Sequence, residues 1–220
     1  MLAVPDRAIE EIASILATSG LPPLPVLHTS GALGREPLAA LADAGWSTGS
    51  LHPLVAVTRT SHGPSALTGA WFALQADDSA RILGNGIVRA AGGRILELAD
   101  DGKPLYHAAA VFASNYVVVL LSLAERLASL AGADPHDARE AFTTLAVGAL
   151  AGVKDLGPDH ALTGPIARGD VETVALHLSR LSAPDRSLYS RLARAALDLS
   201  RPRLARESVV RLEALLGEEE

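Results

Sequence analysis

The longest apolar stretch of the chain, residues 103–126 (KPLYHAAAVFASNYVVVLLSLAER), most constrains what the chain can fold into. It contains no glycine, and its single proline, Pro104, stands where the first turn of a helix tolerates one. We therefore predict one long buried helix. Its second half, residues 117–121 (VVVLL), is apolar on every side. This half needs cover from other helices or from a second copy of the chain.

Polar side chains lie along one face of the first half of this predicted helix. His107 and Ser114 would be roughly 20° apart around the helix axis and about 10 Å apart along it, with Lys103 close to the same face. A polar stripe on an otherwise buried helix needs polar partners. A bound ligand would supply them, and the structural alternative is a core histidine whose partners belong to the fold.

The same stretch has about the length that spans a bilayer. Polar residues inside it argue against insertion, and so does the lack of a second comparable segment in the sequence. The N-terminus shows no basic region ahead of an apolar one, which a secretory signal would have. We expect a cytoplasmic protein without a membrane partner.

The composition narrows the classes of partner and site. With 49% hydrophobic and 20% charged residues, the chain of 220 residues is globular and long enough to bury a core. A net charge of −6 without a basic stripe excludes nucleic acid as a partner. The absence of cysteine excludes disulfides and thiolate metal sites. The seven histidines are scattered without an HExxH motif, so we predict no metal site.

The periodicity changes near residue 99. Before it, short apolar strands alternate with helices, which predicts an α/β domain with a parallel sheet over residues 1–99. After it, the pattern is helical only, which predicts an all-α domain over residues 100–220. We expect strands at residues 2–4, 26–28, 50–53, 70–75 and 94–98, and helices at 7–18, 36–44, 77–91, 103–126, 135–153, 170–181, 184–199 and 203–216. Because a buried parallel strand needs neighbours on both sides, an apolar strand at residues 2–4 leads us to expect a missing segment before it.

Short segments that contain polar residues follow the first predicted strands. Pro5 comes after the first strand, His28 and Ser30 after the second, and His52 after the third. The carboxyl ends of parallel strands meet at one edge of a sheet, where ligands bind. The alternative is that each histidine braces its own loop.

A second polar cluster lies in residues 161–170 (ALTGPIARGD). Thr163 belongs to a turn, and Arg168 precedes a glycine in a loop, where a guanidinium suits a carboxylate or phosphate. The structural alternative is a connection between helices that ends in a good N-cap, Asp170.

Five segments in order resemble one protein family: LAVPD at 2–6, HTSGALG at 28–34, GWSTGSLHPL at 45–54, KPLYHAAAVFASNY at 103–116 and ALTGPIARGD at 161–170. The family is that of Rossmann-like proteins with a helical C-terminal domain of unknown function 2520. It resembles the 6-phosphogluconate dehydrogenase-like superfamily, which includes pyrroline-5-carboxylate reductase and ketopantoate reductase. The sequence departs from the family in lacking the first half of the fold, with its GxGxxG turn. The resemblance therefore implies an N-terminally truncated chain, through a mis-called start or a true truncation.

The resemblance implies the C-terminal part of a Rossmann-like sheet that binds NADP, followed by a helical domain that forms a homodimer and closes over a small-molecule substrate. It also implies hydride transfer by analogy. On this reading, Pro5, His28, Ser30 and His52 would contact the cofactor, Lys103, His107 and Asn115 would be catalytic, and Ser114, Thr163 and Arg168 would bind substrate. His107 or Lys103 would donate the proton.

Two other functions remain open. The chain could be a non-catalytic dimer that binds a small ligand or a partner through its helical domain, which suits the missing phosphate-binding turn. It could also be a truncation product without independent function.

Overall fold

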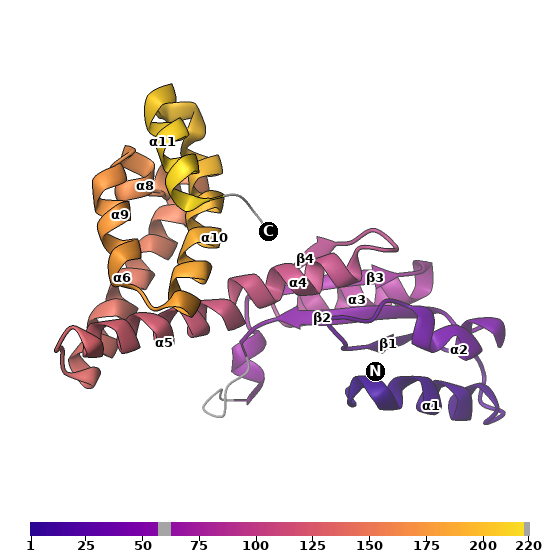
Figure 1. Ribbon diagram of the computed structural model, residues 1–220. Helices are drawn as coiled ribbons and strands as arrows, with labels where there is room; N and C mark the ends of the chain where they lie inside the picture. Colours follow the sequence, from indigo (N-terminus) through magenta and orange to yellow (C-terminus); the bar gives the residue numbers. More distant parts are fainter. Residues whose placement is uncertain (57–62, 218–220) are drawn as a thin grey trace. The chain divides into compact units, whose positions relative to one another are not determined.

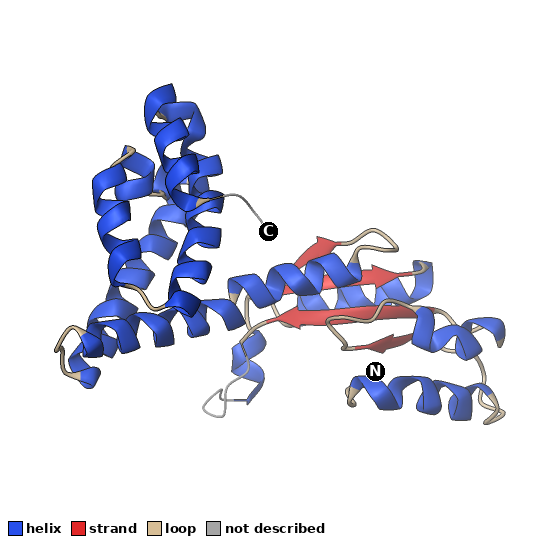
Figure 2. Cartoon of the chain, viewed as in Figure 1, coloured by secondary structure: helices blue, strands red, loops and turns tan. Residues whose placement is uncertain are grey.

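The computed structural model of the protein describes residues 1–56 and 63–217 (Figure 1). The chain divides into two compact units, residues 1–120 and residues 121–220. All strands in the described part of the chain belong to the first unit (Figure 2). The expected class, a small α/β sheet followed by a helical domain, is confirmed.

The sheet has four strands in the order β1-β2-β3-β4: β1 (Val26–His28), β2 (Thr48–Leu54), β3 (Trp71–Ala76) and β4 (Arg94–Glu97). β1 and β2 are parallel, as are β3 and β4, but β2 and β3 are antiparallel. The prediction of a purely parallel sheet is therefore wrong at the central pair. A parallel neighbour needs a crossover helix. Such helices follow β1 and β3, whereas the described part of the β2–β3 connection contains only a short 3₁₀ helix, η2 (Gly63–Leu67).

The sheet is covered by helices whose apolar residues form two cores. α3 (Asp78–Ala90) packs on β2, β3 and β4 (Figure 1). Its Ala80 and Val88 belong to one core cluster with the strand residues Leu51, Phe72 and Leu74. The second core joins α1 (Asp6–Ala17), the 3₁₀ helix η1 (Glu36–Leu38) and α2 (Ala39–Asp43). Residues 2–4, expected as a strand, form a single parallel bridge between Leu2 and His28.

Asp77, at the N-cap of α3, ties this helix to the sheet. Its carboxylate accepts a hydrogen bond from the Thr48 backbone N–H at 2.7 Å and forms an ion pair with Arg35 at 3.2 Å. The Ser47 hydroxyl donates to the same carboxylate. This carboxylate also accepts from the Ala80 backbone N–H, which caps the helix.

The predicted long helix is two helices, α4 (Lys103–Ala113) and α5 (Asn115–Leu130). Ser114, between them, has φ −126° and ψ −72°, outside the helical region. Serine and asparagine side chains compete with the helical backbone for hydrogen bonds, which gives a physical reason for a break at residues 114 and 115. α4 belongs to the first compact unit, which ends at residue 120. The domain boundary near residue 99 stays a prediction.

The expected burial of this stretch is also wrong for the single chain. α5 has no buried residue, and the exposed fractions of Val118 and Val119 are 67% and 55%. Residues 103–130 are long and apolar enough to cross a membrane, with a mean hydropathy of 1.7, but length and composition alone are weak evidence for it. Cover by a second copy of the chain remains a prediction.

The second unit is helical throughout its described part. After α5 it contains α6 (Pro135–Leu156), α7 (Pro158–Ala161), α8 (Pro165–Arg168), α9 (Val171–Arg180), α10 (Ala183–Ser200), the 3₁₀ helix η3 (Arg201–Arg203) and α11 (Arg206–Leu216). The core of this unit contains residues of α8 to α11, with Val174 and Leu212 fully buried. The four helices predicted after residue 130 are confirmed, with ends shifted by up to three residues.

Candidate functional site

The first turn of α4 is anchored to the loop after β1 by a buried lysine. The Lys103 Nζ donates a hydrogen bond to the Ser30 carbonyl oxygen at 2.9 Å, and the side chain is almost fully buried. Burial lowers the pKa of Lys103 to about 8, against the opposing influence of the Asp6 and Glu36 carboxylates. At neutral pH the site therefore contains a buried positive charge.

His28, at the end of β1, braces the loop that carries Ser30. Its Nε2 lies 2.5 Å from the Gly34 carbonyl oxygen, and its Nδ1 accepts from the Ser30 backbone N–H at 3.2 Å. A carbonyl only accepts, so the proton is on Nε2 and both nitrogens are occupied. Burial lowers the pKa of His28, which keeps the ring neutral. The structure thus favours the bracing alternative, and no ring nitrogen is left for a cofactor.

Ser30 connects the same loop to the start of α1. Its hydroxyl donates to the Asp6 carboxylate at 2.8 Å and accepts from the Leu33 backbone N–H at 3.0 Å. Pro5 is exposed immediately before Asp6. The strand-end residues expected from the sequence are therefore gathered around this loop, although the side chains of His28 and Ser30 serve the fold.

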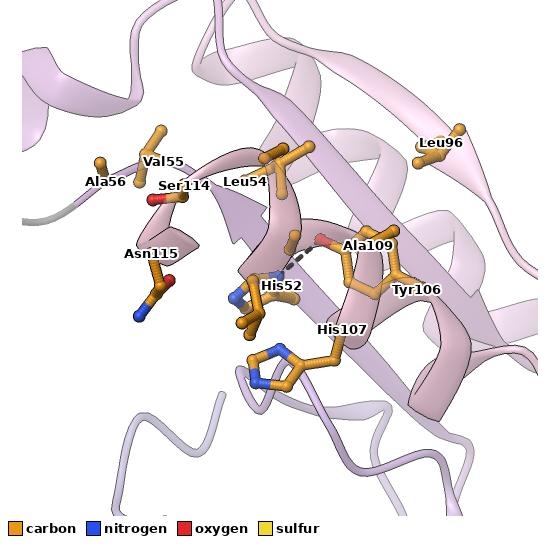
Figure 3. A pocket seen from close by; sticks show the side chains of 13 residues that line it. His52, Leu54, Val55, Ala56, Leu96, Tyr106, His107, Ala109, Ser114 and Asn115 are labelled. Atoms are coloured by element: carbon orange, nitrogen blue, oxygen red, sulfur yellow. Dashed lines mark hydrogen bonds between the residues drawn. The ribbon is translucent and has the colours of Figure 1, made fainter. Parts of the chain in front are cut away.

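His52, in β2, forms a pair with Tyr106 of α4. The His52 Nδ1 and the Tyr106 hydroxyl are 2.7 Å apart (Figure 3). Among the described residues the His52 Nε2 has no hydrogen-bond partner. Burial, the Lys103 ammonium and His107 together lower the pKa of His52 to about 4. His52 is therefore a neutral imidazole at physiological pH with one nitrogen free.

His107 stands one residue after Tyr106 and faces the same loop. The rings of His107 and His52 have centroids 6.3 Å apart. The His107 Nδ1 is buried without a partner in the described part of the chain. A Cβ added at Gly31 would lie 2.7 Å from this nitrogen and 3.0 Å from the His52 Nε2. Only glycine lets the backbone approach both imidazoles this closely.

An open cavity of about 550 Å³ adjoins this histidine pair (Figure 3). The ends of β2 and β4 and one face of α4 enclose it, down to the break before α5. Its lining contains His52, Leu54, Val55, Ala56, Leu96, Tyr106, His107, Ala109, Ala110, Val111, Ala113, Ser114 and Asn115. The structure thus brings together four of the residues singled out in the sequence, His52, His107, Ser114 and Asn115. Their chemical roles stay predictions.

Tyr106 is the site residue that sequence reasoning missed. The only signal was a hydroxyl beside His107 in an apolar helix, because its partner His52 is 54 positions away in the sequence. Lys103, in contrast, does not line the cavity. Its ammonium contacts the Ser30 carbonyl in the loop after β1.

Thr163 and Arg168 belong to the second unit. The Arg168 side chain is exposed at the end of α8, and Gly169 follows in the left-handed conformation with φ 70°. Asp170 caps α9, accepting from the Thr173 backbone N–H at 3.0 Å and from its hydroxyl at 2.8 Å. The structural alternative for this cluster, a connection with a good N-cap, therefore describes its local geometry.

Solved structures share this architecture. A protein from Thermotoga maritima is 26% identical with a TM-score of 0.71, over 91% of this chain and 77% of that one. A Bacteroides fragilis protein, described as a candidate NADP oxidoreductase, is 19% identical with a TM-score of 0.68, over 89% and 73% of the two chains. A Plasmodium falciparum pyrroline carboxylate reductase with NADP bound is 12% identical with a TM-score of 0.59, over 98% and 78%. The last two likenesses concern the fold alone.

Among curated proteins, none matches the chain. The family described as domain of unknown function (DUF2520) matches residues 70–196, more than half of the sequence. The match begins at β3, continues through α4 with Lys103, Tyr106 and His107, and ends within α10. The sheet before it and the helices after it also have counterparts in the solved structures, which cover most of the chain. The chain therefore belongs to the DUF2520 family and has an oxidoreductase-like fold.

Proposed function

We propose that the protein is an NADP-dependent oxidoreductase that transfers a hydride to a small molecule bound in the cavity of the first unit. The carrying observation is the juxtaposition of two imidazoles, a tyrosine hydroxyl and a glycine backbone beside an open cavity of about 550 Å³. Largely apolar cavities with a few convergent polar groups are typical ligand sites. The fold shared with oxidoreductases, one of which binds NADP, supports the cofactor.

The residues of this sequence fit one end of such a cofactor. The orphaned His107 Nδ1 and the loop at Gly31 offer polar groups and close backbone approach beside the cavity, which suit the nicotinamide end. The sequence contains no GxGxxG turn to hold the pyrophosphate. When bound, the cofactor supplies the hydride.

We assign the chain's own residues the remaining tasks. His52 presents its free Nε2 to the substrate, held in place by the Tyr106 hydroxyl. His107 donates the proton to the reduced substrate. Lys103 is a positioning residue, because its ammonium holds the Ser30 carbonyl and thereby the backbone at Gly31. Ser114 and Asn115 contact the far end of the substrate.

The first test is a titration with NADPH, followed by turnover assays with carbonyl compounds. His107→Ala should lower kcat/KM by about 10²-fold or more, the usual contribution of a general acid. Leu105→Ala is the matched control, since Leu105 is 80% exposed on the same helix and does not line the cavity. Unchanged turnover in His107→Ala would remove His107 from the mechanism. Loss of folding in this variant would favour the core-histidine alternative.

A second candidate function is a non-catalytic dimer that binds a small ligand. The observation that favours it is the uncovered apolar surface of α5. Failure of NADPH to bind at millimolar concentration, with a ligand still bound in the cavity, would select this alternative. The two functions share the cavity, so one purified preparation tests both.

A further inference from the structure

Among its described residues, the lining of the cavity contains no carboxylate, ammonium or guanidinium group. Its polar groups are two imidazoles, a phenol, a hydroxyl and an amide, and the rest of its lining is aliphatic. His52 is neutral, since its pKa is lowered to about 4. An ammonium moved from water into such a lining loses hydration without gaining a counter-charge. The described lining therefore disfavours a positive charge on the ligand.

A positive charge lies close to the cavity. The Lys103 Nζ is 5.6 Å from the centre of the Tyr106 ring, and the hydroxyl of this ring contacts His52. The Asp6 and Glu36 carboxylates partly offset the ammonium, but at His52 its influence exceeds that of Asp6. The end of the cavity at His52 and His107 therefore disfavours an additional positive charge, and it favours negative charge that develops on an oxygen atom.

We propose that the cavity binds a ketone or aldehyde with an apolar body, its oxygen at His52 and His107, and that it rejects protonated imines. This inference rests on the proposed function for the reaction, though not for the binding. A dihydronicotinamide gives a hydride to the carbonyl carbon and is oxidised, while the C=O π bond breaks. The oxygen takes a proton from His107, which solvent replaces, and the product is an alcohol. An imine would need a positive charge where the site disfavours one.

The test uses two probes of equal size that differ in charge: benzamide and benzamidinium. Binding to the full chain without cofactor is measured by saturation-transfer NMR and calorimetry. Benzamide should bind at least about tenfold more tightly than benzamidinium, which corresponds to about 1.4 kcal/mol. Equal or tighter binding of benzamidinium in the cavity would overturn the inference, and so would undetectable binding of benzamide at millimolar concentration.

Matched variants show whether the probe occupies this cavity. Ala110 and Ala113 line it from α4, whereas Ala108 is exposed on the same helix outside it. Ala110→Leu and Ala113→Leu should weaken benzamide binding about tenfold by filling space, and Ala108→Leu should leave it unchanged. Ala113 is exposed, so its variant keeps the test valid if Ala110→Leu does not fold. Benzamide binding that neither variant weakens would refute the assignment.

The binding test and the proposed function fail separately. NADPH is absent from the probe measurements, so a chain that neither binds nor oxidises NADPH still reports whether neutral ligands are preferred. Conversely, turnover of an imine substrate would retain the oxidoreductase and refute the substrate class.

Discussion

Replacing the buried Lys103 by methionine should stabilise the first unit or leave its stability unchanged at neutral pH, while the site loses function. Methionine has a similar length and fills the same space without a charge. The loss is one hydrogen bond to the Ser30 carbonyl, which also accepts from the Ser50 hydroxyl at 3.3 Å. Removal of a buried charge in favour of an apolar side chain of similar volume is often neutral or stabilising.

The magnitude follows from the pKa of Lys103, which folding lowers from 10.5 to about 8. This difference corresponds to a penalty of about 3 kcal/mol for the charged lysine, fully present below the folded pKa. Between these two pKa values the unfolded state binds more protons, so the free energy of unfolding rises with pH. From neutral pH to about pH 9.5 the gain is about 2 kcal/mol. The hydrogen bond lost in Lys103→Met costs about 1 kcal/mol, which leaves a net gain of up to about 2 kcal/mol at neutral pH.

The assay is urea unfolding followed by tryptophan fluorescence. Both tryptophans of the chain, Trp46 and Trp71, belong to the first unit, so their signal reports this unit alone. Wild-type stability should rise with pH relative to Lys103→Met. Parallel pH profiles would refute the low pKa of the lysine. A loss of more than about 2 kcal/mol in the variant at neutral pH would make Lys103 a stabilising clamp instead.

Three further predictions address the neighbouring parts of the molecule. Gly31→Ala should abolish activity and lower the free energy of unfolding in urea by about 1–3 kcal/mol, because its Cβ would meet both imidazoles. The control Gly86→Ala, with open space around it in α3, should raise the free energy of unfolding by about 0.5–1 kcal/mol. Equal effects of the two substitutions would contradict the close approach of Gly31 to the imidazoles. Tyr106→Phe should lower kcat by about tenfold with a stability change of about 1 kcal/mol, and an unchanged kcat would remove the hydroxyl from the site. Val118→Glu on α5 should convert a homodimer into a monomer in sedimentation experiments, whereas Ser79→Glu, at an exposed position on α3, should not. A monomeric wild type, or partition of the wild type into vesicles, would refute dimerisation through α5.

Local signals explain which elements the sequence predicts. The apolar triplet at Val26–His28 and the capping Asp77 mark their strand and helix through adjacent residues alone. The antiparallel pairing of β2 with β3 depends on how the chain connects these two strands. The sequences of the strands themselves do not indicate their relative direction. The break at Ser114 left a signal in two consecutive polar residues, but the apolar residues on both sides outweighed it in the periodicity.

The candidate site depends on contacts between distant segments, which limits its prediction further. The strand ends were correctly expected to gather, yet His28 has both ring nitrogens occupied by its own loop, while His52 keeps one free. Their positions after apolar strands are similar, so only the surrounding structure separates a bracing histidine from one available to a ligand. Likewise, the helical spacing predicted that Lys103 lies on a polar face of the helix. It did not predict that the ammonium contacts the Ser30 carbonyl and does not line the cavity.

Several locally unfavourable features meet in the first unit, and their coincidence supports a functional site. A buried ammonium at Lys103, an unpartnered nitrogen on His107 and a backbone approach that only Gly31 permits each lower stability or restrict the sequence. A core selected for stability alone would replace the first two with apolar side chains. Because all three adjoin the same two imidazoles beside one cavity, a requirement of binding or chemistry explains them together. The same reasoning predicts that Lys103→Met is more stable than the wild type and less active.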